Sequence, residues 1–473
     1  MWTRLAGFGL ACAGEGWRVY VEEEDDVRRL FDSVRGTSLR IAFRGSGASY
    51  GDASINTGEL VCDCTRMNQI LDWNPETGVI HVEGGGTIEH IWRHVIGDGY
   101  WPPVVSGTMV PTVAGALAMH IHGKNCFAKG PIGDHVLDLR LATPDGRVID
   151  CSPSENKALF EAVISSFGSL GYIVSARLKL TKLHSGRVDV RAFNTRDLDS
   201  MFQCFAEHID KSDYLVGWID GFIRGARWGR GIVHSARYLG EGEDDVSKRS
   251  FHPKDHELPT RILGVSPKKW MWRFVKPFAN RWGMKFINAL KYRVSRLFDR
   301  GKAHKQTLGA FNFLLDFIPD WRKVYLPGGF IQHQSFVPKE HAQECFRRIF
   351  ELCHEHQIPP FLAVFKRHKA DGVLLSHGLD GFSLALDFPI ASYSRGRILE
   401  LTGMIDELVC SVGGRFYPAK DATVSAENFR RALPREDLEA FIALKRQVDP
   451  ENVLQRYLYR RLFEDAPPNQ GLS

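Results

Sequence analysis

Residues 44–52 form a glycine-rich loop that could bind a phosphate. The loop follows an apolar run typical of a strand and reads Arg44-Gly45-Ser46-Gly47-Ala48-Ser49-Tyr50-Gly51-Asp52. Because glycine has no Cβ, successive backbone N–H groups can converge there on an anion. A Rossmann loop has the spacing G-x-G-x-x-G and opens into a helix, whereas this loop has G-x-G-x-x-x-G and leads into another strand. The residues alone therefore predict either a pyrophosphate site of another type or a structural turn.

Small residues and one histidine follow at residues 106–125. They include Gly107, Thr108, Thr112, Val113, Gly115 and Ala118, and then His122-Gly123-Lys124-Asn125. Small side chains let the backbone lie flat against a planar ligand, and the hydroxyls and the imidazole offer polar contacts. A tightly packed helix and a hydrogen-bonded core histidine would explain the same residues. Both interpretations stay open for this segment taken alone.

The cysteines predict reduced thiols and no metal site. There are nine, scattered over the chain without a repeated spacing, which is typical of a protein of the reducing cytoplasm. Two clusters resemble metal ligands, Cys62-Asp63-Cys64 and Cys353-His354-Glu355-His356. Neither has a second half at zinc-ligand spacing, so a buried strand face and a polar helix end are the favoured explanations.

The elements that would position these residues change in character along the chain. Up to about residue 186, short apolar runs alternate with glycine-rich turns, which predicts a helix at 24–34, strands at 39–43, 60–63 and 79–83, and a hairpin turn at Pro144-Asp145-Gly146. Longer elements follow, with strands expected at 188–193, 330–336, 362–365 and 382–387 and a helix at 339–356. A helix at 435–448 is expected in the tail. The pattern predicts an α+β or α/β protein of more than one domain.

Composition excludes several classes of protein. The chain has 473 residues, of which 44% are hydrophobic and 25% charged, enough for two or three cores and too apolar for a disordered chain. No run reaches the roughly 18 apolar residues of a transmembrane helix. Residues 1–14 make a poor export signal because glycines interrupt the apolar run. A cytoplasmic protein is expected.

Residues 268–305 form a basic, tryptophan-rich segment. They hold twelve Lys and Arg residues against Asp299 alone, a net charge of +11 that leaves −6 for the rest of the chain. Trp270, Trp272 and Trp282 lie among these cations. The segment predicts contact with an anionic surface or ligand. No nucleic-acid-binding module is recognisable, so nucleic acid is not an expected partner.

Taken together and in order, the motifs resemble the FAD-linked oxidases of the vanillyl-alcohol oxidase type. Within that superfamily they are most similar to the enzymes that oxidise C2 of a polyprenyl-phosphate-linked ribose. The resemblance rests on Arg44-Gly45, Ser49-Tyr50-Gly51-Asp52, His122-Gly123-Lys124-Asn125, Gly168-Ser169-Leu170-Gly171, Gln332-His333-Gln334, Val364-Phe365-Lys366, Leu386-Asp387-Phe388-Pro389-Ile390, Ala419-Lys420-Asp421 and Lys445-Arg446-Gln447-Val448-Asp449-Pro450.

The resemblance implies a two-part FAD-binding domain. Residues 1–186 and 404–473 would form it, and residues 187–403 would be an inserted α+β substrate domain built on an antiparallel sheet. The FAD contacts that it implies are Arg44, Gly45, Ser46, Gly47, Ala48, Ser49, Tyr50, Gly51, Gly107, Thr108, Thr112, Val113, Gly115, Ala118, His122, Gly123, Gly168, Gly171, Ile173, Tyr417 and Lys420. Covalently flavinylated members often use a histidine in the first glycine-rich loop; none is present here, so FAD is expected to be noncovalent.

The resemblance also implies the reaction. FAD would accept a hydride at N5 from a secondary hydroxyl of a lipid-linked sugar, and a partner short-chain reductase would complete an epimerisation. The implied sugar contacts are Lys124, Gln332, Gln334, Lys366, Ser383 and Ala385. Two of these depart from mycobacterial relatives, because Ala385 replaces a cysteine and Ser383 an asparagine. The identity of the sugar is therefore left open.

Three residues are the catalytic candidates. Lys420 would stabilise the negative charge that develops on the flavin, and Lys420, Tyr50 or His122 would take the hydroxyl proton. An aldonolactone or alditol oxidase acting on a free sugar is the alternative enzyme. An adaptor without flavin that binds membrane or nucleic acid is the alternative of another class.

The basic segment has two interpretations. It could be a mobile lid of short helices beside the active site that docks on an anionic membrane, which would make the protein peripheral at the inner face of a membrane. It could equally be a solvated basic helix packed on the acidic body.

Overall fold

The computed structural model describes residues 1–259, 261–262, 266–299 and 301–464, with backbone only at 261–262 and 266–267. Its N-terminal part begins with a four-stranded sheet of order β1-β2-β4-β3. The strands are β1 (Trp2–Ala6), β2 (Ala13–Tyr20), β3 (Ile41–Arg44) and β4 (Leu60–Asp63). Helix α1 (Glu24–Val34) buries Val27, Phe31 and Val34, one face of a 3.6-residue period, and Glu23 with Asp26 forms its capping box. The predicted bounds of this helix and of the strand at 60–63 are confirmed.

A five-stranded antiparallel sheet of order β5-β6-β10-β8-β9 follows. Its strands are β5 (Ile70–Asn74), β6 (Val79–Glu83), β8 (Val136–Ala142), β9 (Val148–Cys151) and β10 (Tyr172–Lys179). β8 and β9 form the predicted hairpin, where Gly146 has φ +88°. Helices α2 (Ile88–Val95) and α3 (Val113–Ala118) lie between β6 and β8 in the chain.

The largest sheet is antiparallel and has eight strands in the order β17-β12-β14-β13-β19-β20-β18-β21. The strands are β12 (Arg187–Thr195), β13 (Tyr214–Ile219), β14 (Gly231–Tyr238), β17 (His304–Thr307), β18 (Phe330–Pro338), β19 (Leu362–His368), β20 (Gly381–Pro389) and β21 (Arg415–Phe416). The mixed α/β fold with antiparallel sheets agrees with the prediction.

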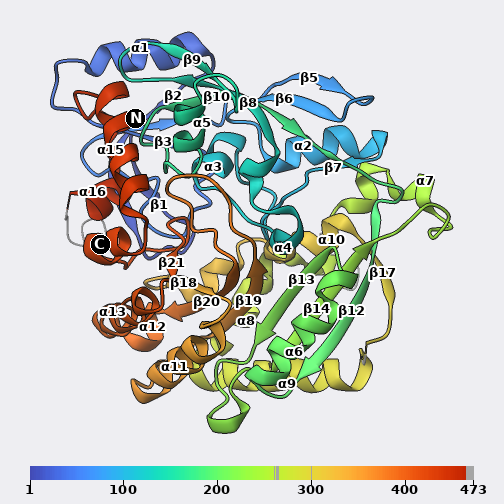
Figure 1. Ribbon diagram of the computed structural model, residues 1–473. Helices are drawn as coiled ribbons and strands as arrows, with labels where there is room; N and C mark the ends of the chain where they lie inside the picture. Colours follow the sequence, from blue (N-terminus) through green and yellow to red (C-terminus); the bar gives the residue numbers. More distant parts are fainter. Residues whose placement is uncertain (260, 263–265, 300, 465–473) are drawn as a thin grey trace.

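The two faces of this sheet have different neighbours. Helices α6 (Leu198–His208), α11 (Ala342–Glu355) and α13 (Arg395–Ser411) pack on one face, where Phe365 of β19 meets Phe205 and Phe346. Because side chains alternate along a strand, Val364 and Lys366 point to the opposite face. In Figure 1 the N-terminal strands and helices lie above this sheet.

The basic segment differs from the predicted run of short helices. After α8 (Met271–Val275), residues 281–298 form one 18-residue helix, α9 (Arg281–Phe298), along the lower edge of Figure 1. The side chain of Asn280 accepts hydrogen bonds from Trp282 N and Gly283 N and so begins the helix. No described helix has the length and apolar character needed to cross a membrane.

The C-terminal residues return to the N-terminal half, beside the blue strands in Figure 1. Helices α15 (Arg435–Val448) and α16 (Tyr457–Phe463) lie there, and the predicted bounds of α15 are confirmed. Arg461 of α16 forms buried ion pairs with Asp52 and Asp421. The division at residues 403 and 404 stays a prediction, and α13 continues across it.

Candidate active site

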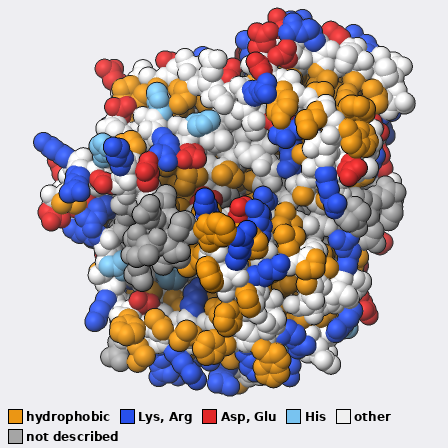
Figure 2. All heavy atoms as spheres, turned by 180° about the vertical axis from the view of Figure 1, so that it is seen from behind, with side chains coloured by type: hydrophobic (Ala, Val, Ile, Leu, Met, Phe, Trp, Pro, Cys, Tyr) orange, Lys and Arg blue, Asp and Glu red, His pale blue; other side chains and the backbone are white. Residues whose placement is uncertain are grey.

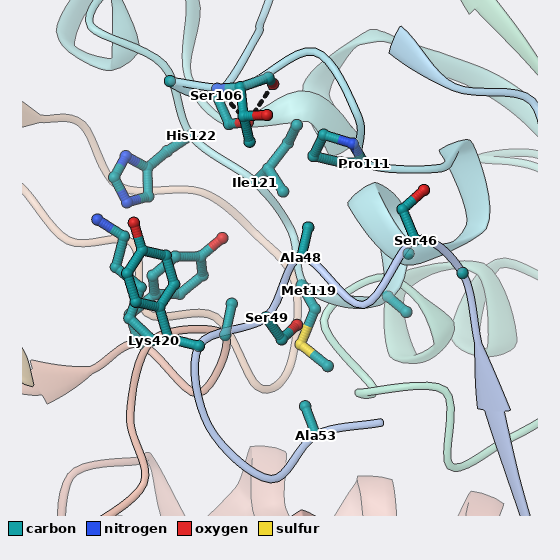
Figure 3. A pocket seen from close by; sticks show the side chains of 18 of the residues that line it. Ser46, Ala48, Ser49, Ala53, Ser106, Pro111, Met119, Ile121, His122 and Lys420 are labelled. Carbon is teal, nitrogen blue, oxygen red and sulfur yellow. Dashed lines mark hydrogen bonds between the residues drawn. The ribbon is translucent and has the colours of Figure 1, made fainter. Parts of the chain in front are cut away.

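A cavity of about 400 Å³ lies where the three parts of the chain meet. The glycine-rich loop, the segment around α3, strands β13 and β19 of the large sheet and the turn that carries Lys420 all line it. Its volume is in the range of small-molecule and cofactor sites. Figure 3 shows His122 and Lys420 at one end and Ser46 at the other.

The glycine-rich loop packs tightly against the residue that begins α3. A Cβ on Gly45 would lie 2.2 Å from Thr112 Oγ1, and Gly47 has φ +65°, so both positions require glycine. Ser46 Oγ donates a hydrogen bond to Val110 O at 2.6 Å. The loop is thus held with its backbone at the cavity wall, as an anion-binding loop must be.

Most of the predicted FAD contacts line this cavity. They are Arg44, Gly45, Ser46, Gly47, Ala48, Ser49, Tyr50, Gly107, Thr108, Thr112, Gly115, Ala118, His122, Gly168, Gly171, Ile173, Tyr417 and Lys420. Three others lie behind the wall. Val113 is fully buried in the core, a Cβ on Gly51 would lie 2.3 Å from Asp421 O, and one on Gly123 would lie 2.3 Å from Asn125 Oδ1.

The predicted sugar contacts also divide into residues that line the cavity and residues that lie behind its wall. Lys124, Gln332 and Lys366 line the cavity. Gln334 and Ser383 form a layer behind it, in which Gln334 Nε2 donates to Ser383 Oγ at 3.0 Å. Ala385 is register partner of both Gln334 and Val364 and is buried.

His122 lies between two nitrogen-bearing side chains. Lys366 Nζ is 3.4 Å from His122 Nδ1, and Gln334 Nε2 is 3.3 Å from His122 Nε2. Burial and the neighbouring Lys366 charge hold the pKa of His122 well below its ordinary value. Burial and the nearby Lys420 charge lower the pKa of Lys366 to about 7. Both groups can therefore be uncharged near neutral pH.

Burial shifts the pKa values of Lys420 and Tyr50 in opposite directions. Burial lowers the pKa of Lys420 to about 8, although Asp387 opposes the shift, and its Nζ lies 5.7 Å from the Tyr50 ring centroid. Burial and the Asp387 charge raise the pKa of Tyr50 well above its ordinary value, so its phenol keeps its proton. Asp387 Oδ1 accepts a hydrogen bond from Gln332 Nε2. Burial raises the pKa of Asp387 to about 7.

The described wall of the cavity is cationic. It carries Arg44, Lys124, Lys291, Lys366, Lys420 and Arg456, whereas none of its described residues is Asp or Glu. An anionic ligand suits such a wall.

Several of its residues were missed from the sequence. They are Arg456, which donates to Ala53 O and Gly168 O, and Trp218, His234 and Lys291 at the far end. Arg456 has no local motif, and Lys291 sits in a run of cations that gave no sign of which one turns inward.

FAD suits the chemistry of these residues. The loop offers backbone N–H groups and Arg44 for a pyrophosphate, and Gln332 Oε1 is buried without a partner among the described residues. An unsatisfied buried acceptor is costly unless a ligand supplies a donor. No group of three or more His, Cys, Asp or Glu side chains in the described ranges is placed to hold a metal ion.

Comparison with known proteins gives the same cofactor. A family model for an FAD binding domain matches residues 17–152. Decaprenylphosphoryl-beta-D-ribose oxidase of Mycolicibacterium smegmatis is 31% identical over 442 residues, 92% of each chain. L-gulono-1,4-lactone dehydrogenase of Mycobacterium tuberculosis is 21% identical over 436 residues, 91% of each chain. Cytokinin dehydrogenase 9 of Oryza sativa subsp. japonica is 28% identical over 228 residues, 48% of this chain and 43% of the relative.

Identity of 31% along nearly the whole length, together with the match to the family model, settles the family. The chain belongs to the FAD-linked oxidoreductases of the vanillyl-alcohol oxidase type, and FAD is its cofactor.

Proposed function

We propose that the protein oxidises a secondary hydroxyl, at C2 of a pentose linked to a polyprenyl phosphate, as the first half of an epimerisation. The observation that carries this proposal is the cluster of His122, Lys366 and Lys420 at the end of the cavity opposite the phosphate-binding loop. The similarity to an oxidase of decaprenylphosphoryl-beta-D-ribose supports the substrate class. The keto product would then need a short-chain reductase as partner.

The residues of the cluster would have different roles in alcohol oxidation. Bound FAD supplies the hydride acceptor. The Lys420 ammonium stabilises negative charge that grows during the transfer. Lys366, which is partly neutral near pH 7, accepts the hydroxyl proton, and neutral His122 lies beside it, with its Nδ1 3.4 Å from Lys366 Nζ. Tyr50 holds its own proton and orients the hydroxyl. Gln332 holds the other sugar hydroxyls, and Gln334, Ser383 and Ala385 shape the wall behind it.

The domain roles are part of the same proposal. Residues 1–186 and 404–473 bind FAD, and residues 187–403 bind the sugar through the sheet face that carries Val364 and Lys366. Buried contacts between Arg461 and Asp52 and between Arg456 and Gly168 support joining the two outer parts.

Anaerobic bleaching of the flavin by a panel of substrates tests the reaction. We expect a short prenylphosphoryl pentose to bleach the bound flavin rapidly, and the free pentose and an aldonolactone to do so slowly or not at all. Rapid bleaching by the lactone alone would favour the alternative activity, an aldonolactone oxidase, which the lactone dehydrogenase relative motivates.

We further propose that FAD is bound noncovalently, because residues 44–51 contain no histidine to which it could be attached. Acid precipitation of the purified protein should leave the yellow colour in the supernatant. Flavin that stays with the washed pellet would contradict this.

The outer face of α9 is proposed as a docking surface for an anionic membrane. The helix buries Asn288, Tyr292 and Ser295 and exposes Trp282 and Phe286 to 82% and 64%. Burying polar residues while exposing large apolar ones is the reverse of an ordinary surface helix. Hydrophobic side chains lie among Lys and Arg along the lower part of the face in Figure 2, as in helices that lie in a membrane interface. The protein would then be peripheral at the inner face of the membrane.

A further inference from the structure

The cavity continues beyond the sugar-side cluster, between α9 and the large sheet. Val216 and Trp218 of β13, His234 of β14 and Lys291 of α9 line this end. Val216 pairs with His234 across the two strands, and Trp218 is two residues from Val216. All three side chains therefore project from the same face of the sheet, toward α9.

Lys291 is held over this face by its helix. Asn288 Nδ2, one turn earlier, donates to Asp220 Oδ1 at 3.4 Å and to Phe361 O at 3.5 Å, and Tyr292 packs with Trp218 and Ile232. These contacts fix the rotation of α9 about its axis. Lys291 Nζ lies 4.3 Å from the centroid of the Trp218 ring, so its ammonium reaches into the cavity, away from the exposed apolar face of the helix.

A second cation approaches from the FAD-binding part. Lys124 is fixed beside β13 by the hydrogen bond from Leu215 N to Lys124 O, at 2.9 Å. Its Nζ donates to the carbonyl oxygens of Phe311 and Asn312. Both acceptors are neutral, so the positive charge of Lys124 has no counterion there.

The cations at this end lack acidic partners in the wall. Lys291 is exposed and Lys124 is half-buried, and no Asp or Glu of the described wall lies beside either of them. Burial, together with the charges of Lys291 and Lys124, lowers the pKa of half-buried His234 to about 4 and leaves it a neutral N–H donor; Asp299 opposes this but does not line the cavity. Cations without a counterion make the potential at this end of the cavity positive. A bound anion would supply the missing counterion.

The rest of this end is apolar and reaches the surface. Leu362 and Val364 of β19 line it, and so does Leu314, which is 58% exposed. Leu314 thus marks a mouth of the cavity. An anion with an apolar tail could place its charge at Lys291 and lead its tail out past Leu314.

We propose that Lys291, His234 and Lys124 form a subsite that binds the phosphate group of a prenyl phosphate. The proposal rests on the proposed function, since it assigns the part of the lipid-linked substrate next to the sugar. No sequence motif indicated Lys291 as a binding residue. Helix α9 would then have two roles, because its inner side binds the phosphate and its outer face binds the lipid surface.

Calorimetric titration of the FAD-loaded protein with geranyl phosphate tests the subsite without any sugar. Geraniol, the same chain without the phosphate, and inorganic phosphate are the comparison ligands. We expect geranyl phosphate to bind at least about 10-fold more tightly than geraniol. Lys291→Gln should lower the affinity for geranyl phosphate by about 10-fold or more, which is the usual effect of losing a charged hydrogen bond. The affinity for geraniol should be unchanged.

Lys285→Gln is the matched control, because Lys285 is an exposed cation of the same helix that does not line the cavity. It should bind geranyl phosphate like the parent, and Lys291→Arg should keep most of the affinity. The flavin spectrum of each variant confirms that it is folded and loaded.

Two results would overturn the subsite: equal affinity for geraniol and geranyl phosphate, or unchanged affinity in Lys291→Gln. If inorganic phosphate binds as tightly as geranyl phosphate, and its binding depends on Lys291 in the same way, then a prenyl phosphate is not the specific ligand of the subsite. Because the titration contains no sugar, these results are independent of the bleaching assay. A subsite that binds geranyl phosphate in a protein whose flavin no sugar bleaches would mean that the proposed oxidation alone has failed.

Discussion

At the scale of single residues, the site is governed by buried nitrogen bases. Lys366 and Lys420 lie near one another in a cavity whose described wall carries no carboxylate, and burial lowers the pKa of both, to about 7 and about 8. A lysine becomes useful for proton transfer when its pKa approaches the working pH. The two side chains can therefore differ in charge at neutral pH, with Lys420 protonated and Lys366 partly neutral.

The first residue-scale prediction is a loss of rate above about pH 8. Lys420 is charged below its pKa and neutral above it, so its stabilisation of the reduced flavin disappears as the pH rises through that value. We expect the rate of anaerobic flavin reduction at saturating substrate to fall there. Lys420→Met should reduce flavin about 10²-fold more slowly at pH 7 and should lack this decline, as measured by stopped-flow absorbance.

Retention of FAD by Lys420→Met is the control that separates catalysis from cofactor binding. A variant that keeps both the parental rate and the decline above pH 8 would remove Lys420 from the mechanism.

At the scale of elements, α9 has its polar residues toward the protein and its large apolar residues toward solvent, an orientation that a solvated basic helix would not have. Its buried positions are Asn288, Tyr292 and Ser295, and its large apolar side chains are outside. The exposed set comprises Trp282, Phe286, Leu290, Val294, Leu297 and Phe298. Charged residues such as Arg281 and Arg293 accompany them, so the surface combines apolar and cationic contacts. Lys268, earlier in the basic segment, is buried with its Nζ 3.3 Å from the Phe317 ring centroid and does not contribute to it.

The element-scale prediction concerns binding to vesicles. Sedimentation with vesicles of anionic phospholipid should be salt-sensitive and should fall several-fold in the double variant Trp282→Ser, Phe286→Ser, because two interfacial rings are lost. Leu137→Ser, on an exposed position of β8, should sediment like the parent. Turnover of a short water-soluble substrate should be unchanged in both. Equal sedimentation of the double variant and the parent would mean that α9 is merely a solvated helix.

At the scale of the whole molecule, distant parts of the chain meet through buried charges. Arg461 donates to both carboxylate oxygens of Asp52, at 2.8 and 3.0 Å, and to Asp421 Oδ2 at 2.8 Å. Asp421 in turn accepts from the backbone N–H groups of Thr423 and Val424. The network therefore joins the glycine-rich loop region to the turn that carries Lys420.

Arg461→Met should lower the free energy of unfolding by about 3–5 kcal/mol, because it leaves buried carboxylates without their cation. Although burial acts to raise it, pairing with Arg461 keeps the pKa of Asp421 below its ordinary value. The stabilisation is thus present above about pH 4 and is lost as the pH falls further. Urea denaturation followed by flavin fluorescence measures the free energy of unfolding. The variant should differ from the parent by a large amount at pH 7 and by a smaller amount below pH 4.

Arg460→Met is the matched control, since Arg460 pairs with Glu59 at 3.6 Å near the surface. Partly exposed pairs contribute about 0–1 kcal/mol. Equal effects of the two substitutions would show that the buried network does not tie the parts together.

Features of the fold that depend on local interactions were predictable from the amino-acid sequence. Helices 24–34 and 435–448 have the predicted bounds because their apolar period and their ends are local, and the turn at 144–146 follows from the φ that Gly146 adopts. The motifs, through their order, also indicated the family and FAD. The glycine-rich loop could be located because only glycine tolerates its contacts.

Which side chains reach the cavity depends on how distant elements pack together. Gln334 and Ser383 lie behind its wall, whereas Arg456 and Lys291 line it. Each outcome depends on the rotation of one element against another that is far away in the chain, as when Asn288 fixes α9 against Asp220 and Phe361. A sequence pattern gives the period of a helix or strand, but packing between distant elements sets the direction in which each side chain points.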